Sequence, residues 1–172
     1  MKKVSFQNDI LPLKNKLYRL AVRITLNPED AEDTVQETMM KVWNKRQQWE
    51  QIESMEAFCM TICRNIALDK THRMTGSEQS LDADEHDAPD TNYHANPEQQ
   101  TIEQDRIRLV RTIIDSLPEK QRSVIQLRDF EGKSYKEIAA ILEISEEQVK
   151  VNIYRARQTV KQKYQEFQEY GL

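Results

Sequence analysis

The sequence predicts an all-α fold of two small helical domains joined by a flexible acidic linker. Apolar residues recur at helical spacing on both sides of the linker, and no stretch shows the alternation typical of a β-strand. Three Gly and five Pro supply little turn chemistry for a β-sandwich or barrel. At 172 residues, 38% hydrophobic and 31% charged, the chain suits small units with thin cores.

The first unit, residues 1–74, is expected to hold three helices. Asn27 and Pro28 indicate a helix start, with an N-cap, a proline at the first position and acids in the first turn. That helix should run to about residue 46, and Ser54 should cap the third after a polar loop at about 47–53. The residues expected in the core are Ile10, Leu13, Leu17, Leu20, Ala21 and Ile24, then Ala31, Val35, Met39, Val42 and Trp43, then Met55, Phe58, Cys59, Ile62 and Ile66.

The second unit, residues 101–172, opens with an amphipathic helix over about 102–117. Pro118 near a start and Gly132 past an end bracket the next helix. Ser134 with Glu137 forms a capping box for a short helix, and Ser145 with Gln148 caps the last one. Its buried stripe should be Val149, Ile153, Ala156 and Val160, after Ile138, Ala139 and Leu142 of the short helix.

The net charge of -4 is unevenly distributed along the chain. Residues 1–73 hold 12 Lys and Arg against 10 Asp and Glu, and residues 101–172 hold 13 against 12. Residues 74–100 hold none against 7, with almost no aliphatic side chains. This composition predicts a flexible linker, placed at residues 75–100, that can extend to about 90 Å. The acidity therefore does not exclude nucleic acid as a partner of the terminal units.

Two short helices joined by a tight turn are typical of a helix-turn-helix. With Val149, Ile153 and Ala156 inward, the last helix should present Gln148, Lys150, Val151, Asn152 and Arg155 outward. Gln and Asn can pair with adenine, and Arg or Lys with guanine. Arg155, Arg157, Lys161 and Lys163 suit phosphates. The alternative is that these side chains form only the solvated face of a surface helix.

The string "LPEKQRSVIQLRDFEGKSYKEIAAILEISEEQVKVNIYRAR" closely resembles domain 4 of sigma-70 family sigma factors. "NPEDAEDTVQETMMKVW" followed by "FCMTICRNIALDKTHR" resembles sigma domain 2. Both occur in the family's order and cover nearly all the chain outside the linker. With only these two domains, the chain is similar to the extracytoplasmic-function (ECF) subfamily.

The resemblance implies a factor that binds bacterial core RNA polymerase, through its beta-prime and beta subunits, and directs it to promoter DNA. Domain 2 would read and melt the −10 element, and domain 4 would read the −35 element, about two helical turns or about 70 Å away. An anti-sigma factor is an expected further partner. The implied core-polymerase-binding residues are Asp33, Gln36, Glu37 and Met40, the −10 DNA-binding residues are Trp49, Thr61, Arg64, Asn65, Lys70 and Arg73, and the −35 DNA-binding residues are Ser145, Glu146, Glu147, Gln148, Lys150, Asn152, Arg155 and Arg157.

Three of these expectations leave alternatives open. The face on residues 33–40 could be a solvated helix surface, Trp49 could pack in the core, and the linker could be only a tether or lie in the polymerase's RNA path. The sequence also departs from the family pattern. Phe58 stands where the family has Trp, Thr61 where a basic residue is frequent, and Glu143 in the turn where Gly is usual.

Glu146 and Glu147 lie in the first turn of the last helix, where phosphate repulsion should be strongest. Acids there also favour the helix dipole by about 0.3–1 kcal/mol, and a Glu can accept from cytosine N4. Glu143 would cost about 1–2 kcal/mol if its backbone is left-handed.

Other classes of protein fit the sequence less well. A one-component repressor or activator would not need the "DAEDTVQE" segment, and an adaptor that binds only proteins would not need base-reading side chains. The sequence shows no Gly-rich phosphate loop, metal cluster or nucleophile–base pair, so we expect no enzyme activity, no cofactor and no small-molecule substrate. Cys59 and Cys63 are expected to be buried apolar residues. Without a signal sequence or an apolar run of membrane length, the expected location is the cytoplasm, not embedded in a membrane.

Overall fold

The structure is a computed structural model that describes residues 3–77 and 101–170, and within these ranges all regular elements are helical. The first unit comprises the short turns η1 (Phe6–Ile10) and η2 (Leu11–Leu13), then α1 (Lys14–Thr25), α2 (Pro28–Asn44), η3 (Arg46–Gln51) and α3 (Met55–Ser77). Helices α1, α2 and α3 all pack on one another. The Asn27 side chain caps α2 by accepting from the amides of Glu29 and Asp30, as predicted.

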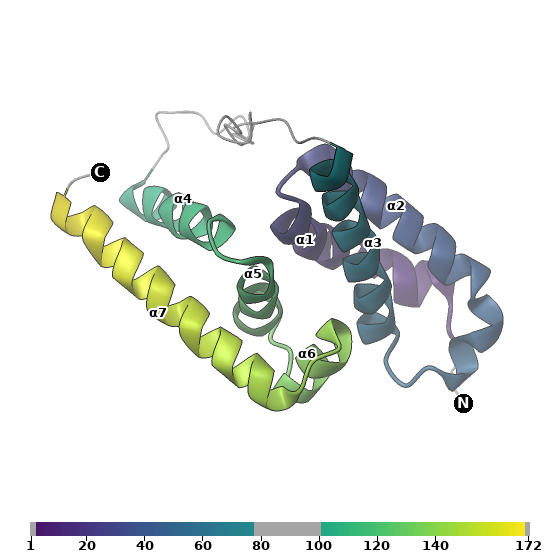
Figure 1. Cartoon of the computed structure of the whole chain (residues 1–172). Helices are drawn as coiled ribbons and strands as arrows, with labels where there is room; N and C mark the ends of the chain where they lie inside the picture. The colour runs from purple at the N-terminus through teal and green to yellow at the C-terminus, as the bar shows by residue number, and fades with distance from the viewer. Residues whose placement is uncertain (1–2, 78–100, 171–172) are drawn as a thin grey trace.

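The second unit comprises α4 (Ile102–Asp115), α5 (Glu119–Ile125), the π-helical turn η6 (Gln126–Phe130), α6 (Tyr135–Leu142) and α7 (Glu146–Tyr170). Figure 1 shows α4 and α7 as an arm that extends from α5 and α6. Both predicted capping boxes are present, Ser134 with Glu137 on α6 and Ser145 with Gln148 on α7. Gly132 ends η6 with a φ of 68°, which a glycine adopts without steric cost.

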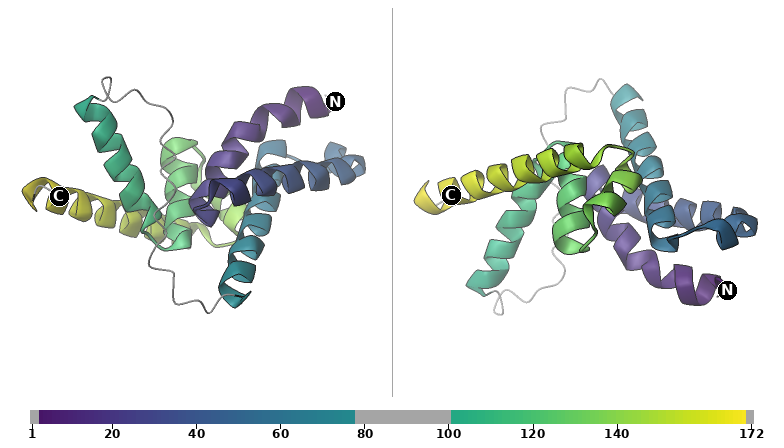
Figure 2. Two further views of the ribbon diagram at one scale, coloured as in Figure 1. Left: turned by 90° about the horizontal axis from the view of Figure 1, so that it is seen from above. Right: turned by 90° about the horizontal axis from the view of Figure 1, so that it is seen from below.

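The two units share one buried core. Leu20 and Ile24 of α1 belong to the same buried cluster as Val124, Leu127 and Ile138 of the second unit. Helix α3 packs on α6, and α1 packs on α5. The two views in Figure 2 show α5 and α6 lying between the three-helix unit and the α4–α7 arm. Sequence alone did not place the units relative to each other, and this contact is the main feature it missed.

The predicted core is largely confirmed, with one error. Trp43 is exposed, because the buried side of α2 is completed by Thr34 and Thr38, whose hydroxyls donate to the carbonyls of Asp30 and Thr34. A threonine that satisfies its hydroxyl within its own helix can enter a core, and counting only apolar residues overlooks it.

The predicted domain limits are only partly visible in the structure. Helix α3 continues through Ser77, beyond the predicted start of the linker at residue 75. Residues 78–100, which hold most of the predicted linker, lie outside the described residues. Within the part of the chain that is described, no helix is long and apolar enough to cross a membrane.

Candidate polymerase and nucleic-acid interface

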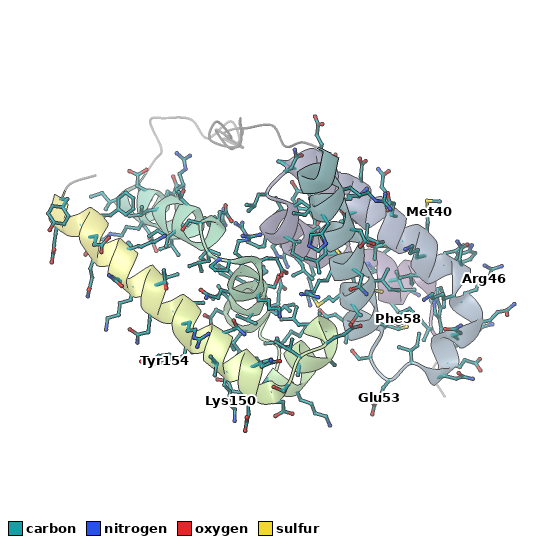
Figure 3. The ribbon with its side chains drawn as sticks, in the orientation of Figure 1. Met40, Arg46, Glu53, Phe58, Lys150 and Tyr154 are labelled. Carbon is teal, nitrogen blue, oxygen red and sulfur yellow. The ribbon has the colours of Figure 1, made fainter. Side chains whose placement is uncertain are left out.

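The predicted polymerase face lies on the solvent side of α2. Asp33, Gln36, Glu37 and Met40 are all exposed, and Met40 is 66% exposed, the exposure of an unpartnered apolar residue on a surface. Figure 3 shows Met40 projecting from α2 away from the second unit. The Glu37 carboxylate also accepts a hydrogen bond from Lys70 Nζ of α3 at 2.8 Å. The face is therefore free to meet a partner while the two units are packed together.

The loop after α2 differs from the predicted base pocket. Trp49 is only 7% exposed, and its indole Nε1 donates to the Val42 carbonyl at 3.0 Å. Of the two interpretations of Trp49, the structure shows core packing. A buried indole whose N–H is satisfied cannot stack on a base without leaving the core.

A different aromatic residue is exposed beside this loop. Trp43 is 47% exposed and makes edge contacts with Phe6 and Trp49, at ring-centroid distances of 5.6 and 6.1 Å. The Arg46 guanidinium lies 4.8 Å from the Trp43 centroid, and Figure 3 shows Arg46 at the outer end of the unit. Lys45 lies 5.9 Å from the ring of Phe58. Aromatic rings with flanking cations suit single-stranded nucleic acid. Helical spacing in the sequence does not distinguish the exposed Trp43 from the buried Trp49.

The predicted −10 strip on α3 is partly occupied by other contacts. Asn65 and Arg73 are exposed, but Lys70 pairs with Glu37, and the Thr61 hydroxyl donates to the Ala57 carbonyl at 2.9 Å. Arg64 was predicted on the exposed strip, but it is only 7% exposed and pairs with Glu119 of α5. The docking of the second unit on α3 is what covers it.

The turn of the helix-turn-helix is left-handed at Glu143. Its φ of 56° and ψ of 44° are the conformation in which a glutamate costs about 1–2 kcal/mol. The Ser145 hydroxyl accepts from the Gln148 amide at 3.1 Å, and Gln148 Oε1 accepts from the Ser145 amide at 3.2 Å. These two side chains are therefore used for capping and are less free to meet bases. Glu146 and Glu147 are exposed in the first turn of α7.

The outward face of α7 includes one large residue that the sequence analysis missed. Lys150, Val151 and Arg155 are exposed as predicted, and Tyr154 between them is 66% exposed. Figure 3 shows Lys150 and Tyr154 projecting from the outer side of α7. By contrast, Asn152 is half-buried, and its Nδ2 donates to the Gln148 carbonyl at 2.8 Å. The spacing from Glu147 to Tyr154 and Arg155 could have identified Tyr154, because these positions share one helical face.

Of the four cations expected to meet phosphates, two are exposed and two are engaged in contacts within the protein. Arg155 and Lys161 are exposed, whereas Arg157 forms an ion pair with Asp129, which raises the pKa of the Arg157 guanidinium through the hydrogen bond. Lys163 donates to the Ser116 hydroxyl at 3.0 Å and so is directed toward α4. In this conformation Lys163 is therefore not positioned for the phosphate contact that the sequence predicted.

Tyr135 and Arg128, which were not among the predicted site residues, form an aromatic–cation cluster with the predicted residue Lys150 at the start of α6. The Arg128 guanidinium is 4.7 Å from the centroid of Tyr135, and Lys150 Nζ is 5.9 Å from it. The ring thus lies beside two cations from different elements, next to the outward face of α7.

No group of three or more metal-ligating side chains occurs within residues 3–77 and 101–170. Cys59 and Cys63 are fully buried, and burial raises the pKa of each thiol to about 12. A thiol that stays protonated is a poor nucleophile and metal ligand. Both cysteines thus serve as small core residues, as predicted.

Comparison with known families matches two models on this chain. Residues 10–75 match sigma-70 region 2, and residues 107–160 match sigma-70 region 4. The first match covers α1 to α3 with the exposed face of α2, and the second covers the helix-turn-helix.

Several characterised proteins are similar to the chain. It is 32% identical to the ECF RNA polymerase sigma factor SigE of Mycolicibacterium smegmatis over 147 residues, which are 86% of this chain and 56% of SigE. The chain thus spans little more than half of that relative. It is 27% identical to the RNA polymerase sigma-H factor of Pseudomonas aeruginosa, over 92% of this chain and 85% of that protein.

The fold is also found in solved structures. The sigma factor RpoE in complex with the anti-sigma factor NepR from Bartonella quintana superposes with a TM-score of 0.71 at 26% identity, covering 91% of this chain and 94% of that one. The structure of CnrH in complex with the cytosolic domain of CnrY gives a TM-score of 0.64 at 20% identity, covering 91% and 84%. With both region models matched in order and ECF factors among its relatives, the chain belongs to the sigma-70 family of RNA polymerase sigma factors, in the ECF group.

Proposed function

We propose that the chain binds bacterial core RNA polymerase and directs it to promoters with its two units, residues 1–74 on the −10 element and residues 101–172 on the −35 element. The observation that carries the proposal is the pair of exposed faces on α2 and α7, each within a matched sigma region. The protein acts in the cytoplasm as an initiation factor without enzymatic activity of its own.

The face of α2 is the proposed contact with the polymerase beta-prime subunit. Its carboxylates at Asp33 and Glu37 suit a basic partner surface, and Met40 supplies an apolar contact at the C-terminal end of the face. The beta subunit is the proposed partner of the second unit.

The outward face of α7 is the proposed −35 reader. Lys150 and Arg155 can donate to guanine, the Val151 methyl groups can meet thymine methyls, and Glu147 can accept from cytosine. Tyr154 is added to the predicted set because of its exposure. For the −10 element, Asn65 and Arg73 remain the exposed candidates on α3, and Trp43 replaces Trp49 as the residue on which an unstacked base can rest.

An anti-sigma factor is a proposed partner as well. Two solved relatives with this fold are complexes of a sigma factor with NepR and of CnrH with CnrY.

A titration of core polymerase against labelled protein tests the polymerase contact. Glu37→Lys should weaken binding about tenfold or more, because it reverses one charge at the centre of the face. Lys70→Ala is the matched control, since it removes the same ion pair with Glu37 but leaves the carboxylate in place. Unchanged affinity in Glu37→Lys, or an equal loss in both variants, would contradict the assignment of this face.

A further inference from the structure

The ring of Tyr135, the first residue of α6, lies beside Lys150, one of the proposed −35 readers on α7. We propose that Tyr135 is a positioning residue, whose ring holds the Lys150 ammonium away from the carboxylates of its own helix and so keeps it available to a base. The inference rests on the proposed function, because it concerns how Lys150 meets the −35 element.

Two kinds of contact hold the Tyr135 ring in place. The half-buried side chain packs against the core cluster that contains Ile138 and Val149. The Arg128 guanidinium lies 4.7 Å from the ring centroid, and Arg128 Nη1 donates to the Lys133 carbonyl at 2.8 Å. A ring that is anchored by the core and by a hydrogen-bonded guanidinium offers a fixed surface to a second, more flexible cation.

An ion pair between α7 and η6 joins the two elements that supply the cations. Asp129, which follows Arg128 in η6, accepts hydrogen bonds from Arg157 Nε at 3.1 Å and from Arg157 Nη2. The two parallel hydrogen bonds fix the direction of this pair as well as its position. The segment that carries Arg128 is thereby tied to the helix that carries Lys150.

Lys150 is the flexible member of this cluster. It is exposed, and its Nζ lies 5.9 Å from the Tyr135 centroid, within the distance at which a ring attracts a cation. Neither Lys150 nor Arg128 forms an ion pair with a carboxylate of the described residues. Figure 3 shows Lys150 on the outer side of α7. The ring therefore directs the ammonium toward α6 while leaving it at the surface.

Two carboxylates on α7 are the competing partners of Lys150. Glu146 and Glu147 lie four and three residues before Lys150, and both are exposed. Side chains at these spacings are neighbours on a helix, and glutamate four residues before lysine is the favourable orientation for an ion pair. Such a pair is weak at an exposed position, so an adjacent ring can compete with it. Without the ring, Lys150 should turn toward Glu146 and have fewer donors left for guanine O6 and N7.

Base preference at the −35 element, measured with the full-length protein and core polymerase, tests the role of Tyr135. Binding to every single-base −35 variant of a promoter that the protein selects from a random library is compared, and Lys150→Ala identifies the position that Lys150 reads. Tyr135→Leu keeps an apolar side chain against the core but removes the ring, and should lower the preference at that position by about fivefold or more. Tyr135→Phe keeps the ring and should retain the preference. The matched control is Tyr170→Leu, at an exposed tyrosine at the far end of α7, which should leave the preference unchanged.

Combined variants show whether Tyr135 acts through Lys150. Tyr135→Leu together with Lys150→Ala should lose no more preference than Lys150→Ala alone, whereas two independent effects would add. Adding Glu146→Gln to Tyr135→Leu should restore part of the preference, because it removes the competing carboxylate. This restoration also distinguishes a misdirected Lys150 from a misfolded domain, which would not respond to a change at Glu146.

An unchanged preference in Tyr135→Leu, an equal loss in Tyr135→Phe, or an additive loss in the double variant overturns the positioning role. A Lys150→Ala variant that relaxes no −35 position overturns it as well. If Glu146→Gln restores nothing, the competition with Glu146 is overturned. In each of these cases the wild-type protein still directs polymerase to its promoter. A wild-type protein that selects no promoter with core polymerase refutes the proposed function instead, so the two failures are distinguishable.

Discussion

Glu143 and Leu26 are the two non-glycine residues with left-handed backbone within residues 3–77 and 101–170, with φ values of 56° and 55°. Each ends a helix, α6 and α1 respectively. The sequence singled out Glu143 as the position to examine, because a helix-turn-helix usually has glycine there, but nothing in it pointed to Leu26. A left-handed C-cap is usually recognised by a glycine, so a leucine at the end of a helical pattern does not indicate one.

Replacing Glu143 by Gly should raise the free energy of unfolding by about 0.5–1 kcal/mol. The relief of left-handed strain, about 1–2 kcal/mol, exceeds the extra entropy that glycine loses on folding. Urea unfolding followed by circular dichroism measures the difference. The control Glu166→Gly, in the helical interior of α7, should instead lose about 1 kcal/mol. A neutral result for Glu143→Gly would show that no strain is stored in the turn.

The lowered pKa of the Glu56 carboxyl determines how this residue's contribution to the free energy of unfolding depends on pH. Burial alone would raise the pKa of its carboxyl, but hydrogen bonds from Lys133 and Lys16 outweigh burial and lower it. A carboxyl with a lowered pKa in the folded state stabilises the fold above its unfolded value, about 4.3, and loses this contribution as the pH falls through the folded value. Glu56→Gln should therefore be less stable than wild type near pH 7, and the difference should shrink below about pH 4. A difference that is constant with pH would contradict this.

Trp49 has a structural role in the core, whereas the role proposed for Trp43 is in melting the −10 element. Trp49→Ala should destabilise the protein by about 3–5 kcal/mol, the usual cost of removing a buried aromatic side chain. Trp43→Ala should change stability much less, but reduce melting of the −10 element. Permanganate reactivity of thymines in an otherwise bound promoter measures this. Normal reactivity with Trp43→Ala would remove Trp43 from the proposed melting surface.

At the scale of single elements, helix α7 combines a capped start, a buried stripe and a proposed DNA-reading face. The stripe of Val149, Ile153 and Ala156 fixes which side chains point outward. Within the first turns of α7, the side chains of Ser145 and Gln148 cap the helix, and the Asn152 side chain donates to the Gln148 carbonyl. The reading face therefore shifts toward Lys150, Tyr154 and Arg155.

Tyr154→Ala should lower affinity for the preferred −35 sequence by roughly fivefold or more, the lower end of what one base contact contributes. Asn152→Ala, expected from the sequence to relax the preference at one −35 position, should have the smaller effect because its amide is engaged within the helix. Binding of the full factor with core polymerase to every single-base −35 variant measures both. Equal affinity of wild type and Tyr154→Ala for all variants would exclude a base contact by Tyr154.

Helix α3 is the element whose exposed residues could not be predicted correctly from the sequence. Caps, helix limits and buried stripes followed from local patterns, so α1, α2, α6 and α7 were predicted well. Helix α3 packs on α1 and α2 on one side and on α6 on the other. Its polar residue Arg64 is buried by an element distant in sequence. No periodicity within the helix indicates such a contact, and the predicted −10 strip was therefore too broad.

At the scale of the whole molecule, the proposed polymerase face and the proposed DNA-reading face both stay accessible while the two units are packed on each other. Asp33, Gln36, Glu37 and Met40 of α2 are exposed, and so are Lys150, Tyr154 and Arg155 of α7. The units meet mainly through α1 and α3 on one side and α5 and α6 on the other, so neither face is used by the contact between them.

The family resemblance predicted the sigma regions and their order, and the comparisons confirmed both. The packing of the two units on each other was not predicted, because it depends on side chains such as Arg122 and Glu131 that look like ordinary surface charges in the sequence. Their partners lie about a hundred residues away along the chain. Only the folded structure brings them together.

Run-off transcription with purified core polymerase, this protein and a random promoter library tests whether the protein directs polymerase to promoters. We expect transcripts that depend on the protein and that start downstream of two shared sequence blocks, separated by about two helical turns. Transcripts no more abundant than with core polymerase alone, or start sites that share no second block upstream, would contradict it.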